Sequence, residues 1–90
     1  MLFVGLLKAR AGTEQERAGR RLAWQIPDGI EVKAEYWLQT TDPESIFVFE
    51  ADSFAAMMQI SGEWNDLFDV SIFPAIEAKE GLEMLEQMMG

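Results

Sequence analysis

Two short segments that are apolar on both sides constrain the fold most strongly. Residues 2–9 form an almost continuous apolar run, and in residues 45–51 Phe47 and Phe49 alternate with branched aliphatic side chains. Runs of this length and composition are typical of strands that are covered on both faces. The two segments are therefore expected to be the central strands of one sheet.

Two other segments have the pattern of outer strands. Residues 30–39 alternate between apolar side chains at the even positions and a mixed set at the odd positions, which includes Trp37. This alternation predicts a half-buried strand. Residues 70–77 form the fourth predicted strand, and Pro74 cannot donate a hydrogen bond to a central ladder. The fourth strand is therefore expected at the edge of the sheet.

The first predicted helix covers residues 13–26. Thr13 and Glu16 have the spacing of a capping box, and Pro27 ends the helical pattern. Three apolar residues are expected to face the sheet, namely Ala18, Leu22 and Ile26.

A second helix is expected after Asp52 or Ser53, with a break or kink at Ser61 and Gly62. A short helix rich in Met, Leu and Glu is expected from Glu80 onward. The chain is thus predicted to have one domain at residues 1–79 and an acidic, Met-rich helical extension at residues 80–90.

The order of these elements predicts an α+β fold of the ferredoxin-like kind, strand–helix–strand–strand–helix–strand. In that fold the four antiparallel strands have the order 4-1-3-2, with both helices on one face. The first and third strands are then the central pair, which are the two strands that are apolar on both sides. The hydrophobic pattern and the topology agree.

A sheet with both helices on one face leaves its other face uncovered. Apolar side chains from both central strands, together with Trp37 and Phe73, are expected on that uncovered face. A patch of this size exceeds what a monomer usually exposes, so we expect a homodimer formed through the sheet face. The alternative is that the C-terminal helix folds back over the same face.

The charge of the chain excludes several classes of partner. The net charge is −9, and residues 42–90 hold eleven acidic residues and one basic residue. Nucleic acids and anionic membranes attract basic surfaces, so neither is expected as a partner. The opening apolar run has its basic residues after it rather than before it, unlike a signal peptide, so a cytoplasmic location is expected.

The absence of Cys and His excludes the most common catalytic and metal chemistry. No thiolate or imidazole is available to bind zinc, iron or haem, or to act as a nucleophile or base. We therefore expect no cofactor and no metal.

Several sequence blocks resemble a known family. Pro27–Ile30 leads to Tyr36–Trp37, Phe47–Asp52 follows, and Trp64–Leu67 precedes Ile72–Ala78. With these blocks in this order, the chain resembles the family called Domain of Unknown Function 3303, within the dimeric α/β-barrel superfamily. The resemblance implies a barrel-like homodimer and no particular activity.

Four residues are candidates for binding a ligand, and two are candidates for catalysis. Trp37 and Trp64 could stack on a flat molecule and Asn65 could orient it, with Tyr36 beside them. Glu50 or Asp66 could act as a base. The alternative is structural, because aromatic residues fill cores and carboxylates often lie at solvated strand ends or near helix N-termini.

Three functions remain open at this stage. The first is a homodimeric binding or structural module that holds a small apolar or aromatic ligand. The second is a cofactor-independent enzyme, similar to a monooxygenase or an isomerase, that acts on a small hydrophobic or aromatic substrate in a pocket between sheet and helices. A third option is an adaptor that binds another protein through the Met-rich tail.

Overall fold

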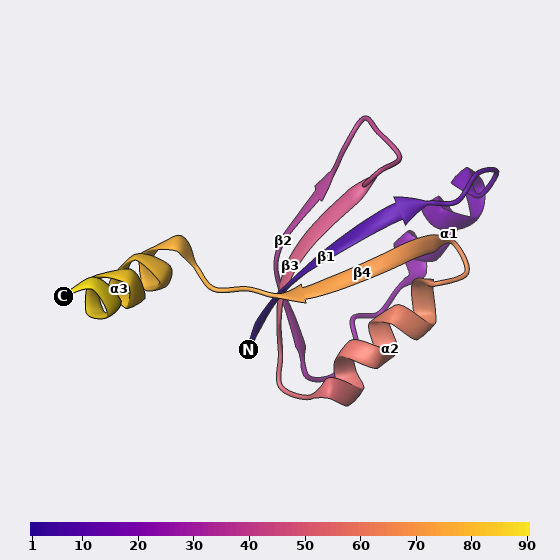
Figure 1. The fold of residues 1–90 in the computed structure, drawn as a ribbon. Helices are drawn as coiled ribbons and strands as arrows, with labels where there is room; N and C mark the ends of the chain where they lie inside the picture. The colour runs from indigo at the N-terminus through magenta and orange to yellow at the C-terminus, as the bar shows by residue number, and fades with distance from the viewer.

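Four strands and three helices account for most of the chain in the computed structural model, which describes residues 1–90 (Figure 1). The ferredoxin-like order of strands and helices that the sequence predicts is confirmed, with a third helix after it. The elements are β1 (Leu2–Ala9), α1 (Glu14–Ala23), β2 (Ile30–Trp37), β3 (Ser45–Ala51), α2 (Phe54–Trp64), β4 (Phe68–Pro74) and α3 (Ala78–Met89).

The sheet has the strand order β2-β3-β1-β4, and every neighbouring pair is antiparallel. The two strands that are apolar on both sides, β1 and β3, are the central pair, as predicted. Pro74 is the last residue of β4, which is an edge strand. A residue without an N–H group is tolerated at the edge of a sheet.

The core lies between the sheet and α2. Phe49 is fully buried, and its ring stacks on that of Phe47 with the ring centres 4.8 Å apart. Ile60 from α2 and Leu67 from the following turn are at most 2% exposed. The helical half of this core comes from α2, and α1 contributes no buried residue to it.

A β-bulge interrupts the alternation of β2. Val32 pairs with Phe49 and Ala34 pairs with Val48, so Lys33 has no partner residue across the ladder. One extra residue in a strand moves every later side chain to the opposite face. Even-numbered residues of β2 therefore face the helices before the bulge, and odd-numbered residues face them after it.

The bulge overturns the predicted positions of two aromatic residues. Trp37 pairs with Ser45 on the face that the helices cover, whereas Tyr36 pairs with Ile46 on the uncovered face. The expectation that Trp37 lies on the uncovered face is wrong, because strict alternation was assumed across Lys33. Phe73 does lie on that face, since it pairs with Val4.

Helix α1 differs from its prediction in both length and orientation. It ends at Ala23 rather than Ile26, and it has no buried residue. Leu22 is 90% exposed and Ile26 is 45% exposed, so the predicted inward stripe is wrong for these two residues. The capping box is also absent, because the Thr13 hydroxyl donates to the Arg10 carbonyl at 2.7 Å.

Helix α2 begins as predicted and ends later. The Ser53 hydroxyl accepts a hydrogen bond from the Ala56 amide, which caps the helix. The predicted break near Ser61 is wrong, since the helix continues to Trp64. Ile60 and Trp64 are one turn apart and both buried, so packing on each side of Gly62 holds the helix continuous.

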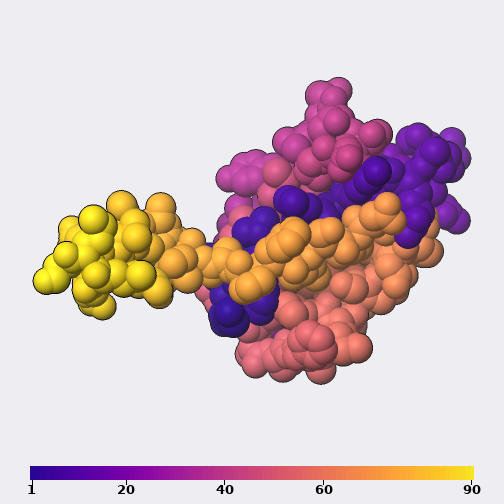
Figure 2. Space-filling view, viewed as in Figure 1, coloured from indigo at the N-terminus to yellow at the C-terminus, as the bar shows by residue number.

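Helix α3 projects from the end of the sheet and covers neither face (Figures 1 and 2). It has no buried residue, and the chain measures 52 × 29 × 17 Å as a result. The uncovered sheet face therefore lies open in the single chain. None of the three helices combines the length and the apolar character that crossing a membrane requires.

Candidate functional site

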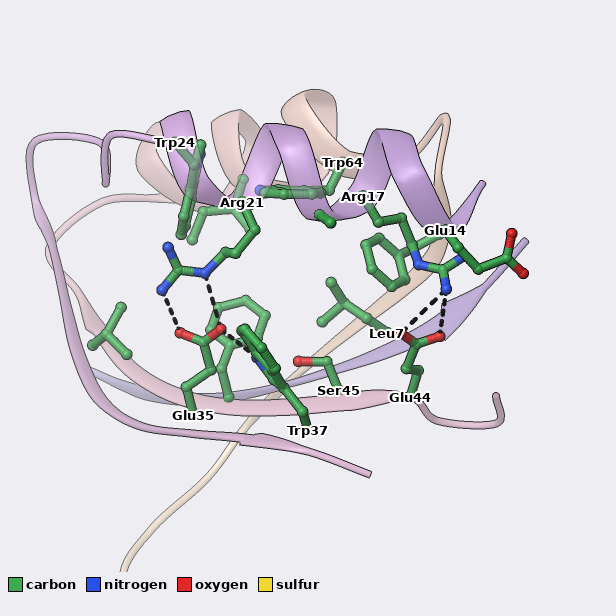
Figure 3. Close-up of a pocket in the computed structure, with 15 residues that line it drawn as sticks. Leu7, Glu14, Arg17, Arg21, Trp24, Glu35, Trp37, Glu44, Ser45 and Trp64 are labelled. Atoms are coloured by element: carbon green, nitrogen blue, oxygen red, sulfur yellow. Dashed lines mark hydrogen bonds and ion pairs between the residues drawn. The ribbon is translucent and has the colours of Figure 1, made fainter. Parts of the chain in front are cut away.

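A cavity of about 310 Å³ lies between α1 and the half of the sheet formed by β2 and β3 (Figure 3). This volume is at the lower end of the range for small-molecule sites. The deep wall is apolar and is formed by Leu7, Val32, Phe47, Ile60, Trp64 and Phe68.

The cavity exists because α1 lies away from the sheet. The small side chain of Ala18 is the only apolar group of the helix proper on the lining, and it is too short to fill the space below it. Arg17 and Arg21 flank Ala18 on the same face and reach down to carboxylates of the sheet layer (Figure 3). Two long ion-paired side chains thus keep the helix and sheet apart.

Arg21 and Glu35 form the first of these ion pairs. Nη2 and Nε of Arg21 donate to the two carboxylate oxygens of Glu35 at 2.8 and 3.0 Å. The Trp37 indole N–H donates to the same carboxylate at 2.8 Å. The hydrogen bonds from Arg21, and then the one from Trp37, hold the pKa of Glu35 below its usual value.

Arg17 and Glu44 form the second ion pair, at the other end of the cavity. Nη2 of Arg17 lies 3.0 Å from Glu44 Oε2, and Nη1 donates to the Arg10 carbonyl at 3.2 Å. The guanidinium also lies over the ring of Phe68, 5.7 Å from its centre. The Arg17 side chain is only 12% exposed, so desolvation strengthens these charge-assisted contacts.

A third ion pair ties α1 to the end of α2, outside the cavity. Arg20 donates to both carboxylate oxygens of Asp66 and to the Glu63 carbonyl, the last at 2.8 Å. The hydrogen bond from Arg20 lowers the pKa of Asp66. The arginines of α1 therefore pair with carboxylates from other parts of the chain rather than with the glutamates of their own helix.

The structure brings two of the four predicted ligand-binding residues to the cavity. Trp37 and Trp64 line it, from β2 and α2 respectively. Tyr36 lies on the opposite face of the sheet, and Asn65 follows α2, where its carbonyl accepts hydrogen bonds from Arg10.

Neither candidate base lines the cavity. Glu50 is near the end of β3, and its carboxylate is 3.1 Å from the amino group of Met1. Asp66 is paired with Arg20 on the outside of the helical layer. The lowered pKa of Asp66 makes it a weaker base than an ordinary carboxylate.

None of the polar residues on the cavity lining is among the predicted ligand-binding or catalytic residues. Arg17, Arg21, Glu35, Glu44 and Ser45 all line the cavity. The spacing of four residues between the two arginines, which places both on one side of a helix, was the one available signal. Their carboxylate partners lie 14 and 27 residues away, so local patterns could not pair them.

The cavity offers an apolar wall and aromatic stacking surfaces, and two of the three glutamates on its lining are held in ion pairs. Trp24, Trp37 and Trp64 come from three different elements or their ends and surround the same space. Trp24 and Trp64 meet edge to face with ring centres 5.6 Å apart. Such walls suit a flat apolar molecule. No group of three or more acidic residues lies close enough to hold a metal ion.

Comparison with known proteins places the chain in a family. The model of the family described as Domain of unknown function (DUF3303) matches residues 1–89. The chain belongs to this family. No curated protein matches the chain, and no solved structure matches it. The match covers the whole ferredoxin-like sheet, both helices that pack near it, and all of α3.

Proposed function

We propose that this member of the family is a homodimeric binding module that holds a small apolar or aromatic molecule in the cavity under α1. The observation that carries the proposal is the cavity of about 310 Å³ with three tryptophans on its lining. Burial of a flat apolar ligand there would remove apolar surface from water on both partners, which favours binding. The candidate bases Glu50 and Asp66 lie elsewhere, and this favours a binding role over an enzymatic one.

The uncovered sheet face supports the homodimer. It consists of the outward side chains of all four strands, and α3 does not fold over it. A second copy could bury this face against its own in a closed two-fold interface. Its apolar members are Leu2, Val4, Leu6, Ala34, Tyr36, Ile46, Val48 and Phe73.

Filling the cavity tests the binding role. Ala18→Phe places a ring in the space beneath α1, while Leu22→Phe adds the same bulk on the solvent side of the same helix. We expect 2-methylnaphthalene to shift the backbone amide NMR signals of cavity residues in the wild type and in Leu22→Phe, but not in Ala18→Phe. If the wild type shows no saturable shifts at the cavity, or Ala18→Phe shows the same shifts, the proposal is wrong.

A further inference from the structure

Each arginine on the cavity lining is neutralised by a glutamate. The lining holds two arginines and three glutamates, a formal sum of −1. Arg21 is held by Glu35 and Arg17 by Glu44, one pair at each end of the cavity (Figure 3). The fifth charged residue, Glu14, is exposed in the first turn of α1. No arginine on the lining is left with an unpaired charge.

An anionic ligand would meet arginines whose charge is already neutralised by a glutamate. The guanidinium of Arg21 uses two of its donors on Glu35, and that of Arg17 is shared among Glu44, Thr13 and the Arg10 carbonyl. Removing either arginine from its partner would leave the negative charge of a glutamate unpaired beside an apolar wall, which is unfavourable. The arginines therefore act as supports for α1, and they do not form a carboxylate-binding site.

Ser45 provides the one uncharged hydroxyl on the lining. It is the first residue of β3 and pairs with Leu7 and Trp37 on its two sides, so its side chain faces the helices. In Figure 3 the hydroxyl points into the cavity between the two ion pairs, and no dashed line joins it to another side chain. A hydroxyl can donate one hydrogen bond and also accept.

We infer that the cavity selects an uncharged aromatic molecule with one hydroxyl or carbonyl group, which Ser45 binds, and that it disfavours carboxylates. This inference rests on the proposed binding role and adds the chemistry of the ligand. The aromatic part lies against the tryptophans and Phe47, and its polar group reaches the Ser45 hydroxyl. The paired charges at both ends of the cavity give no net attraction to an anion.

Three probes with the same ring system test the inference at pH 7, namely 2-naphthol, 2-methylnaphthalene and 2-naphthoate. Dissociation constants come from NMR titration of the ¹⁵N-labelled full chain. We expect 2-naphthol to bind about tenfold or more tightly than 2-naphthoate, because the carboxylate would lose water beside an apolar wall without meeting an unneutralised positive charge. Ser45→Ala is expected to weaken 2-naphthol by about three- to tenfold, the usual range for one hydrogen bond, and to leave 2-methylnaphthalene unchanged. Ser45→Thr keeps the hydroxyl and is expected to restore 2-naphthol binding.

The outcomes separate this inference from the proposed function. If 2-methylnaphthalene binds but 2-naphthoate equals 2-naphthol, or if Ser45→Ala weakens both neutral probes equally, the binding role stands and the ligand chemistry is wrong. If none of the three probes binds to the wild type, the binding role is overturned and this inference with it. Circular dichroism of both Ser45 variants confirms that any loss occurs in a folded chain.

Discussion

Arg21 and Glu35 join α1 to the outer strand β2 through two hydrogen bonds of 2.8 and 3.0 Å, with no apolar contact needed between the two elements. Glu35 faces the helix only because the bulge at Lys33 changes the parity of β2. One extra residue in a strand thus sets which carboxylate meets α1. The ion pair keeps the helix above the sheet and the cavity open.

This ion pair predicts a specific pH dependence of stability. The pKa of Glu35 in the folded chain is below its ordinary value near 4.5, mainly because of the hydrogen bond from Arg21. The stabilisation is therefore fully present above the pKa of the unfolded chain, and it is lost as the pH falls through the lower folded pKa. Glu35→Gln should lower the free energy of unfolding at neutral pH, and this difference from the wild type should shrink as the pH falls from the ordinary carboxyl range through the lower folded pKa.

Urea unfolding followed across this pH range measures the effect. Glu83→Gln, on the exposed helix α3, is the matched control and should have the same acid dependence as the wild type. Equal acid dependence in Glu35→Gln and the wild type would show that the Arg21–Glu35 contact does not stabilise the fold.

Gly5 allows the ring of Phe47 to lie across β1. A Cβ at position 5 would lie 2.8 Å from Cζ and 2.9 Å from Cδ1 of Phe47, closer than real Cβ atoms come. Gly5→Ala should therefore destabilise the chain by about 1–3 kcal/mol through overpacking. Gly19→Ala, on α1 with open space around it, should instead stabilise it by about 0.5–1 kcal/mol. Denaturant unfolding of both variants checks the opposite signs, and a neutral Gly5→Ala would contradict the packing described.

The central strands could be predicted because their sequence signal is local. In β1 and β3 the side chains on both sides of the strand are apolar, which is typical of strands at the centre of a sheet. The same reasoning supplied the strand order, since a ferredoxin-like sheet has its first and third strands at the centre. The sequence thus indicated the scaffold of the site, including Trp37 and Trp64 as residues to watch.

The orientation of α1 could not be predicted, because its cause is distant in sequence. Apolar periodicity placed Leu22 inward, on the usual premise that arginine faces water. Arg17 and Arg21 face the sheet because carboxylates of Glu44 and Glu35 meet them there. No Gly or Pro marks a bulge near Lys33, so the face of the sheet on which Glu35 lies could not be predicted either.

Helix α3 is predicted to contribute little to the stability of the rest of the chain. None of its residues is buried, and an isolated helix of 12 residues is marginal in water. Truncation after Glu77 should leave the urea midpoint and the amide NMR spectrum of residues 1–74 essentially unchanged. Ile60→Ala, which removes a side chain that is 1% exposed, should lower stability by about 2–5 kcal/mol in the same assay. A comparable loss on truncation would mean that α3 packs on the sheet in solution.

The proposed homodimer makes a prediction about single charges on the uncovered sheet face. Val4 lies on this face in the central strand β1, paired with Val48 on one side and Phe73 on the other. A lysine at position 4 would bring an ammonium group into the centre of a two-fold interface, where its counterpart from the second copy would repel it. Val4→Lys is therefore expected to convert the dimer into a folded monomer.

Sedimentation velocity at micromolar concentration measures the change. Phe73→Lys, on the edge strand and 52% exposed, should have the same effect with less risk to folding. Leu22→Lys adds the same charge to an exposed site on α1, away from this face, and should remain dimeric. A monomeric wild type, or dimers of normal affinity in both sheet-face variants, would refute association through this face. Because the cavity opens on the other side of the sheet, loss of the dimer is expected to leave ligand binding unchanged.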